Sequence, residues 1–246
     1  MKQHDLTGAT ERLFDNDPYT IGFIAKVLSC EPADNGRYRV ILDRTAFFPE
    51  GGGQPGDTGI IRTPDSTTVA KVLDTQEKNG EIQHITDTPL PCGKVVGAID
   101  FDLRYERMRN HSGEHLLSGF AHRLYGCTNV GFHLNDEAVT VDFDKQLTRP
   151  QLAELEESVN RLIAENVRIT AFYPTPEQLA ELDYRSKLEL TENVRIVEIG
   201  TDGQFDRCAC CAPHVESTAE IGMLLITDSI NYKSGTRLTM VCGENA

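Results

Sequence analysis

Two histidines four residues apart are the first residues in this sequence whose type and spacing suggest chemistry. They lie in the segment His111-Ser-Gly-Glu-His115, among apolar residues at helical spacing. Positions i and i+4 share one face of an α-helix, so both imidazoles can reach a single metal ion. For this motif taken alone, the alternative is a chance pair of histidines beside a core.

A dense group of further metal ligands lies closer to the carboxy terminus, in Cys208-Ala-Cys210-Cys211-Ala-Pro-His214. Thiolates and imidazoles suit zinc, and the two clusters together supply enough ligands for a tetrahedral site. The spacing does not decide which cysteines bind. Cys208 with Cys211 forms a C-x-x-C pair that is typical of redox sites, whereas Cys210 with His214 forms a C-x-x-x-H pair.

A glycine-rich segment, Gly51-Gly52-Gly53-Gln54, is a candidate for substrate binding. Consecutive glycines let a backbone approach a ligand closely, and the glutamine amide both donates and accepts hydrogen bonds. A tight hairpin turn is the alternative. No Gly-Lys-Ser/Thr follows, so the segment is not a phosphate-binding P-loop.

Charged side chains near the histidine pair suggest two further roles. A net charge of -14 argues against a general nucleic-acid binder, so any RNA contact must be local, and Arg104, Arg107 and Arg109 are the candidates. The alternative is an ordinary solvated helix face. Glu114, between the histidines, is a candidate general base, and the alternative is that it points away from the metal-facing side of the helix.

The elements that position these residues fall into two parts. Residues 1–102 read as short strands separated by turns, which predicts a small β-barrel-like domain. The expected strands cover 19–29, 37–43, 68–75, 81–86 and 94–101. After Asp102 the apolar residues recur at helical spacing, so a helix is expected from near Tyr105 to a stop at Gly126.

Residues 103–246 are expected to mix helices with a sheet, which makes the whole chain α+β. Capping boxes at Thr148 with Gln151 and at Thr175 with Gln178 predict two helix starts. The first of these helices carries an apolar stripe. Strands are expected at 138–144, 167–173, 194–200 and 220–226.

The composition is that of a globular protein, with 246 residues, 39% of them hydrophobic and 25% charged. No apolar run is long enough for a membrane helix, and the amino terminus lacks a secretory signal, so a cytoplasmic location without membrane contact is expected. Seven cysteines, three of them crowded together, suit a reducing compartment better than a disulfide framework.

The three motifs together resemble the alanyl-tRNA editing proteins (AlaX type, medium form), which are free-standing relatives of the editing domain of alanyl-tRNA synthetase. The segments that carry the resemblance are LDRTAFFPEGGGQPGDTG, HSGEHLLSG and VRIVEIGTDGQFDRCACCAPHVESTAEIG. The resemblance implies an α/β two-layer editing domain of the threonyl/alanyl-tRNA synthetase type at 103–246. It also implies one Zn2+ per chain on His111, His115, Cys210 and His214. Relatives usually carry Gly-Gly-Thr where this chain has Cys211-Ala212-Pro213, so the pocket wall is altered there.

The function implied by the resemblance is deacylation of tRNA(Ala) charged with the wrong amino acid, with seryl-tRNA(Ala) as the expected substrate and glycyl-tRNA(Ala) as a second. Two other functions compete with it. A closed four-ligand zinc site also fits a tRNA-binding module without catalysis. His111-Ser-Gly-Glu-His115 fits the H-x-x-E-H pattern of a class of metalloproteases, although the thiol-rich second cluster does not.

Overall fold

The structure, a computed structural model, describes residues 10–135, 138–186 and 193–246. The chain forms two compact units: residues 1–51 with 55–105, here called the barrel unit, and residues 52–54 with 106–246, here called the second unit. Within the described residues, no helix is both long enough and apolar enough to span a membrane.

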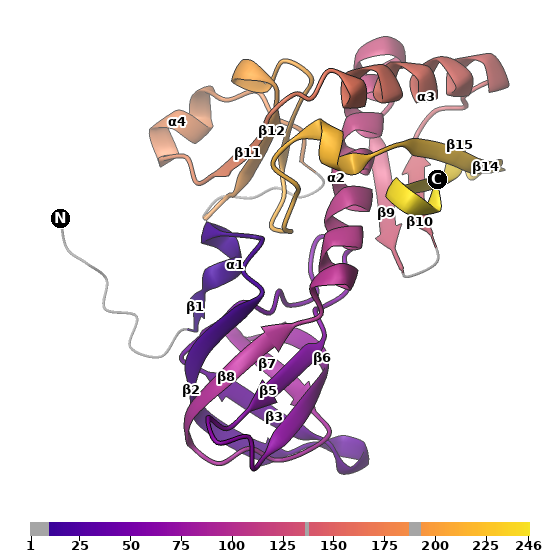
Figure 1. The fold of residues 1–246 in the computed structure, drawn as a ribbon. Coiled ribbons are helices and arrows are strands. Elements are labelled where there is room, and N and C mark those ends of the chain that lie inside the picture. Colours follow the sequence, from indigo (N-terminus) through magenta and orange to yellow (C-terminus); the bar gives the residue numbers. More distant parts are fainter. Residues whose placement is uncertain (1–9, 136–137, 187–192) are drawn as a thin grey trace. The chain divides into compact units, whose positions relative to one another are not determined.

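The barrel unit contains a closed barrel of six strands, which fits the barrel-like domain predicted from the strand pattern. Figure 1 shows its strands in indigo to magenta. In barrel order the strands are β2 (Gly22–Pro32), β3 (Tyr38–Leu42), β7 (Glu81–Thr86), β6 (Val69–Lys78), β5 (Gly59–Arg62) and β8 (Gly93–Ile99). All neighbouring strands are antiparallel. Outside the barrel, β1 (Glu11–Arg12) pairs with β4 (Arg44–Thr45), and α1 spans Leu13–Asn16.

The interior of the barrel follows from the alternation of side chains along its strands. On β2, Phe23, Ala25 and Val27 are buried while the residues between them are exposed. Successive side chains of a strand point to opposite faces, so every second residue enters the core. Phe47 packs edge-on against the ring of Phe23, with ring centroids 5.8 Å apart.

A buried histidine, His84 on β7, lies beside this core. It is 0% exposed, its Nε2 lies 2.8 Å from Thr45 Oγ1, and its Nδ1 lies 3.0 Å from the carbonyl oxygen of Val40. Burial disfavours the charged imidazolium and lowers the pKa of His84 from 6.5 to about 4, against a smaller opposing effect of the hydrogen bond to Val40.

A buried ion pair, Arg104 with Asp57, also lies in the barrel unit. Both side chains are at most 2% exposed. The guanidinium Nε donates to both carboxylate oxygens at 3.0 and 2.9 Å, and other guanidinium nitrogens donate to the carbonyl oxygens of Pro18 and Ala46. The carboxylate also accepts the backbone N–H of Phe48 at 2.7 Å. The pair therefore ties the start of α2 to three separate segments of its unit.

The second unit combines helices with two antiparallel sheets. One sheet has the order β14 (Leu224–Tyr232), β15 (Gly235–Cys242), β10 (Val139–Phe143) and β9 (Asn129–Leu134). The other has the order β11 (Ile169–Phe172), β12 (Ile196–Ile199) and β13 (Asp206–Ala209). This arrangement fits the predicted α+β class. The helices of this unit are α3 (Arg149–Ala164), α4 (Pro176–Glu181) and the greater part of α2 (Phe101–Tyr125).

The helix ends follow local chemistry. At the starts of α3 and α4, the N–H groups of Thr148 and Thr175 donate to the side chains of Gln151 and Gln178 at 2.9 and 2.8 Å, which confirms both capping boxes. α2 ends before Gly126, which has φ +61°, as expected. Its start differs, because it begins at Phe101 rather than near Tyr105.

The earlier start of α2 has a visible cause in Asp100. The carboxylate of Asp100 accepts the N–H of Leu103 at 3.3 Å, and its carbonyl oxygen accepts the N–H of Arg104 at 3.0 Å. This residue therefore caps the helix. The strand predicted at 220–226 is also corrected: Thr218–Ile221 is a 3-10 helix, and β14 begins only at Leu224. Six strands of the described residues were not expected from the sequence: β1, β4, β5, β9, β13 and β15.

The depressed pKa of His84 predicts a pH-dependent stability of the barrel unit. In the unfolded chain His84 is protonated below its ordinary pKa of 6.5, whereas in the folded chain it stays neutral until the pH falls to about 4. The contribution of neutral His84 to the unfolding free energy is therefore complete above pH 6.5 and is lost as the pH falls toward 4. Between pH 8 and pH 5 the loss is about 2 kcal/mol. Urea unfolding at both pH values should show a loss smaller by that amount in His84→Gln than in the wild type. Equal losses would contradict the assignment.

The Arg104–Asp57 pair predicts a large loss of stability in Arg104→Met. The substitution leaves the carboxylate of Asp57 buried without its counter-charge, which costs about 3–5 kcal/mol. Arg44→Met is the matched control, because Arg44 pairs with Glu11 at 3.0 Å on the surface, where both side chains are about half exposed. That exposed pair should contribute less than about 1 kcal/mol to the unfolding free energy. Similar urea midpoints for the two variants would contradict the prediction.

Candidate metal centre

Four side chains with metal-binding atoms converge in the second unit: His111, His115, Cys210 and His214. Their ligand atoms all lie within 4.8 Å of one another. The three histidines are at most 4% exposed. α2 supplies His111 and His115 from adjacent turns of one face, with ring centroids 5.4 Å apart. The structure thus brings together the four residues that the sequence motifs and the resemblance selected.

The loop after β13 supplies the other two side chains. Cys210 Sγ lies 3.4 Å from His214 Nε2 and 3.6 Å from His111 Nε2. Arg195, which is 6% exposed, holds this loop by donating to the carbonyl oxygens of Cys210 and Ala212 at 3.2 and 2.8 Å. The guanidinium of Arg195 therefore holds the backbone of this loop, which helps to fix the positions of Cys210 and His214.

The other two cysteines of this segment stand outside the group. Cys208 is buried on β13, and Cys211 is exposed. Neither belongs to the four residues whose ligand atoms converge. Of the two pairings left open by the sequence, the geometry therefore favours Cys210 with His214 over Cys208 with Cys211.

Each histidine of the group has its second ring nitrogen, Nδ1, next to an oxygen of another side chain. Amide and carboxylate oxygens only accept hydrogen bonds, so those beside His111 and His115 favour the proton on Nδ1 and leave Nε2 as the lone-pair donor toward the group, whereas the hydroxyl beside His214 can donate or accept. The pairs are His111 with Gln54 Oε1 at 3.0 Å, His115 with Asp206 Oδ2 at 3.3 Å, and His214 with Ser112 Oγ at 2.9 Å.

The surroundings favour the uncharged forms of two members of the group. Burial, followed by the electrostatic effects of His115, His111 and Arg195, holds the pKa of His214 well below 6.5. Burial, followed by the nearby Cys211 and Cys208, raises the pKa of the Cys210 thiol. A neutral imidazole is the metal-binding form, and a bound cation would offset the cost of ionising the thiol.

The glycine-rich segment lies directly against this group. Gly53 has φ +84°, and a side chain there would place its first carbon 2.6 Å from the ring of Phe132. Its carbonyl oxygen accepts the N–H of Leu134 at 3.0 Å. A first side-chain carbon on Gly52, which has φ +61°, would lie 3.9 Å from the ring of His111. Gly52 and Gly53 are both exposed. Gly51, the first glycine of the predicted segment, belongs to the barrel unit.

Gln54 is 0% exposed, and its two amide atoms differ in their surroundings. Its oxygen contacts His111, as described above, while its Nε2 is buried without a hydrogen-bond partner among the described residues. A buried donor without a partner is costly, so this amide is prepared to donate to a ligand.

The general-base prediction for Glu114 is corrected by its position. The side chain is 3% exposed, and its carboxylate accepts hydrogen bonds from Ser118 and Asn129. Glu114 is not among the residues whose ligand atoms converge. One position before His115, it is rotated by about 100° around the helix and faces another set of partners.

The structure contradicts the RNA-contact prediction for two of its three arginines, whereas Arg109 is half-buried and stays a prediction. Arg104 and Arg107 are 1% and 5% exposed, so they offer no charge to a phosphate at the surface. The guanidinium of Arg109 packs over the backbone of Gly222 and Gly243. Arg123, by contrast, is exposed at the end of α2, with its guanidinium 4.4 Å from the ring centroid of Phe120.

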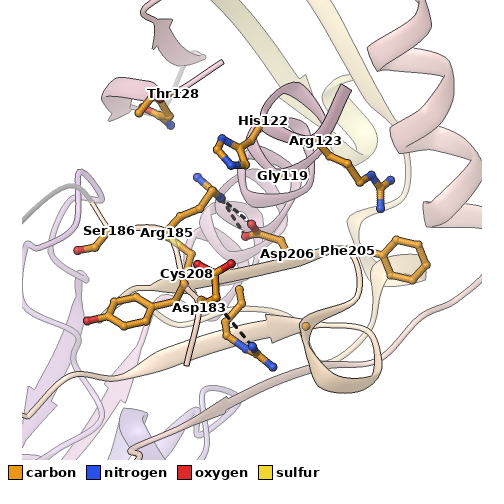
Figure 2. A pocket seen from close by; sticks show the side chains of 14 residues that line it. Gly119, His122, Arg123, Thr128, Asp183, Arg185, Ser186, Phe205, Asp206 and Cys208 are labelled. Carbon is orange, nitrogen blue, oxygen red and sulfur yellow. Dashed lines mark hydrogen bonds and ion pairs between the residues drawn. The ribbon is translucent and has the colours of Figure 1, made fainter. Parts of the chain in front are cut away.

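Sequence reasoning did not identify Asp206, Arg185, Ser112 or Arg195. Ser112 carried a weak signal, because it lies next to His111 in the helical motif. The other three lie in segments whose contact with the histidines depends on tertiary structure. Asp206 and Arg185 line a cavity of about 460 Å³ in the second unit, shown in Figure 2. None of the four converging residues lines this cavity.

Comparisons with known proteins identify the class first. Residues 21–102 match the family described as tRNA synthetases class II (A). Residues 194–239 match the second additional domain of threonyl and alanyl tRNA synthetases, and this range contains Cys210 and His214. Both parts of the chain are thus related to aminoacyl-tRNA synthetases.

Individual relatives are proteins that act on alanyl-tRNA or charge tRNA with alanine, by their names. The chain is 33% identical to the alanyl-tRNA editing protein AlaX-L of Pyrococcus horikoshii, over 96% of this chain and 59% of the relative. It is 37% identical to an alanine–tRNA ligase of Ignicoccus hospitalis, over 95% of this chain and 26% of the relative. The chain is thus similar over most of its length to an alanyl-tRNA editing protein and to part of alanine–tRNA ligases, and it spans about a quarter to three fifths of these relatives' lengths.

The geometry predicts which cysteine matters for metal binding. Cys210→Ala should bind less than about a tenth of the metal held by the wild type after dialysis, because it removes the thiolate that faces two histidines. Cys208→Ala and Cys211→Ala are matched controls within three residues and should retain the wild-type stoichiometry. Elemental analysis of the purified proteins measures this. Full occupancy in Cys210→Ala, with loss in either control, would overturn the ligand assignment.

Proposed function

We propose that this protein deacylates tRNA(Ala) charged with the wrong amino acid, by hydrolysis of the ester bond in trans. The observation that carries the proposal is the group of His111, His115, Cys210 and His214 beside the exposed glycines of the 52–54 segment. The 33% identity to an alanyl-tRNA editing protein over 96% of the chain supports this reaction. We propose the cytoplasm, where tRNA is charged, as its location.

We propose zinc as the metal at this group. Three imidazoles and one thiolate are a typical zinc donor set. Zinc–nitrogen bonds of about 2.0–2.1 Å and a zinc–sulfur bond of about 2.3 Å at tetrahedral angles place nitrogen and sulfur about 3.5 Å apart. The distances from Cys210 Sγ to the two imidazole nitrogens, 3.4 and 3.6 Å, fit this value. When bound, zinc would supply a Lewis acid that binds the amino or hydroxyl group of the substrate or activates a water molecule.

Hydrolysis also requires a position for the substrate, and the residues around the group define one. An aminoacyl ester is already activated, so the protein must mainly orient the ester and a water molecule and stabilise the oxyanion. Gly52 and Gly53 present backbone without side chains at the surface beside His111. Substrate backbone or ribose can therefore approach the group from this side.

Catalysis also needs an open coordination position on the metal, so either the four protein ligands must leave one free or one of them must dissociate. Among the three histidines, His115 faces a carboxylate, whereas His214 faces only the hydroxyl of Ser112, which in addition accepts the N–H of Val215 at 3.3 Å. A neutral hydroxyl holds an imidazole less firmly than a carboxylate does. We therefore propose His214 as the ligand that gives way to substrate.

Two other functions compete with this proposal. Four converging ligands also fit a closed structural site, and a protein that binds zinc and tRNA without hydrolysing the ester would favour a binding module. The metalloprotease alternative is weakened by the placement of Glu114, whose carboxylate is engaged by Ser118 and Asn129 instead of facing the group.

The preferred substrate is predicted to be seryl-tRNA(Ala), with glycyl-tRNA(Ala) second and alanyl-tRNA(Ala) largely spared. Serine differs from alanine by one hydroxyl, and only a site that hydrogen-bonds this hydroxyl can discriminate strongly against alanine. The buried and unpartnered Nε2 of Gln54 is a candidate donor. Comparing kcat/KM for the three charged tRNAs tests the order. Equal rates on the seryl and alanyl esters would refute the specificity.

Gln54→Ala separates two roles of the amide. If Nε2 contacts the serine hydroxyl, the preference for serine over alanine should fall about 10- to 100-fold. If Gln54 acts only by holding His111, zinc affinity should fall and the rates on all three tRNAs should decrease together. Gln76→Ala is the control, because Gln76 is a barrel-unit glutamine that pairs with Glu50 and contacts none of the four ligands.

A further inference from the structure

A buried carboxylate, Asp206, lies between one of the metal-group histidines and an arginine. Asp206 is 5% exposed, at the first position of β13. One carboxylate oxygen lies 3.3 Å from His115 Nδ1. Arg185 donates from Nε to Oδ1 at 2.7 Å and from Nη2 to Oδ2 at 2.9 Å, as the dashed lines in Figure 2 show. The three side chains form a continuous chain of contacts that ends at His115.

The backbone holds Arg185 in this position. Its N–H donates to the carbonyl oxygen of Arg207 at 2.8 Å, and its carbonyl oxygen accepts the N–H of Ala209 at 2.9 Å. An isolated parallel bridge therefore joins Arg185 to Cys208, on the strand that carries Asp206. Because both partners are attached to β13, the two-pronged contact between the guanidinium and the carboxylate is set by the fold rather than by chance side-chain contact.

The partner of His115 differs in kind from those of the other two histidines. His111 faces a neutral amide oxygen and His214 a hydroxyl, while His115 faces a carboxylate. A carboxylate attracts the Nδ1–H of an imidazole more strongly than a neutral acceptor does, although at 3.3 Å His115 Nδ1 makes a close contact with Asp206 and no regular hydrogen bond. Arg185 makes one hydrogen bond to each oxygen of Asp206, and the Oδ2 that accepts from Nη2 is also the oxygen nearest to His115.

We propose that Arg185 and Asp206 act together as the positioning pair of the metal centre, fixing the tautomer and ring orientation of His115 so that its Nε2 faces the other ligands. This inference rests on the proposed metal function. Asp206 touches the ligand, and Arg185 acts through Asp206. Groups that contact a metal-bound histidine from behind typically change metal affinity about 10- to 100-fold when they are removed.

Zinc affinity, measured by competition with a chromophoric chelator, tests the pair. Asp206→Asn should weaken zinc binding about 10- to 100-fold, and Arg185→Gln should weaken it in the same direction. Asp142→Asn is the matched control. Asp142 makes the same two-pronged contact with Arg237, at 2.6 and 2.7 Å, but its partner strand carries no metal-group histidine. The zinc affinity of Asp142→Asn should equal that of the wild type.

A second measurement needs no metal and separates positioning from a general loss of stability. In the metal-free wild type, nitrogen NMR should find His115 with its proton on Nδ1. In Asp206→Asn and Arg185→Gln, the Nε2–H form should become populated, while His111, which faces Gln54, keeps its tautomer. Thermal unfolding of each variant shows whether it is folded under the conditions of measurement.

The outcomes distinguish this inference from the proposed function. Wild-type affinity and an unchanged His115 tautomer in both Asp206→Asn and Arg185→Gln would overturn the positioning pair. If the wild type itself binds no zinc, the proposed metal function fails, and the tautomer measurement alone decides whether the pair orients His115. If Asp206→Asn does not fold, Arg185→Gln decides the question, since its side chain is 21% exposed on the wall of the cavity.

Discussion

The centre of this structure depends on one requirement: three imidazoles must present the same nitrogen to a common point. A histidine ring can turn over and can carry its proton on either nitrogen, so spacing on a helix is insufficient. The protein meets the requirement by placing an oxygen behind each ring, from Gln54, Asp206 and Ser112. Each oxygen comes from a different part of the chain, and this places several folding elements under the same constraint.

Those elements are arranged accordingly. β13 carries Asp206 and leads into the loop of Cys210 and His214, so one strand supplies both a ligand segment and a partner of another ligand. Arg195, which is buried, and Arg185, which is partly buried, each place a positive charge against oxygen atoms. Buried arginines are costly without such partners, so these contacts favour a single arrangement of the loop over its alternatives.

Local sequence patterns predicted what local physics determines. The two-histidine spacing, both capping boxes and the alternation of the barrel strands all depend on residues a few positions apart, and the structure contains each of them. The predictions that were wrong concern side chains whose role depends on distant partners. Arg104 reads as a surface charge until Asp57, 47 residues earlier, lies beside it. Glu114 reads as a base until Asn129 accounts for its carboxylate.

The same limit explains the residues that the sequence did not reveal. Nothing near Asp206 in the sequence distinguishes it from the other acidic residues of an acidic chain, because its role depends on tertiary contacts with His115 and Arg185. Cys210 could not be separated from Cys208 and Cys211 by spacing. Only the turn after β13 decides which sulfur faces the histidines.

The three residues Gly52–Gln54 belong to the second unit although the chain on both sides of them belongs to the barrel unit. A piece of the chain beginning after residue 102 would therefore keep all four metal-binding side chains and still lack the amide behind His111. The polypeptide thus cannot be divided into a dispensable barrel and a self-sufficient centre.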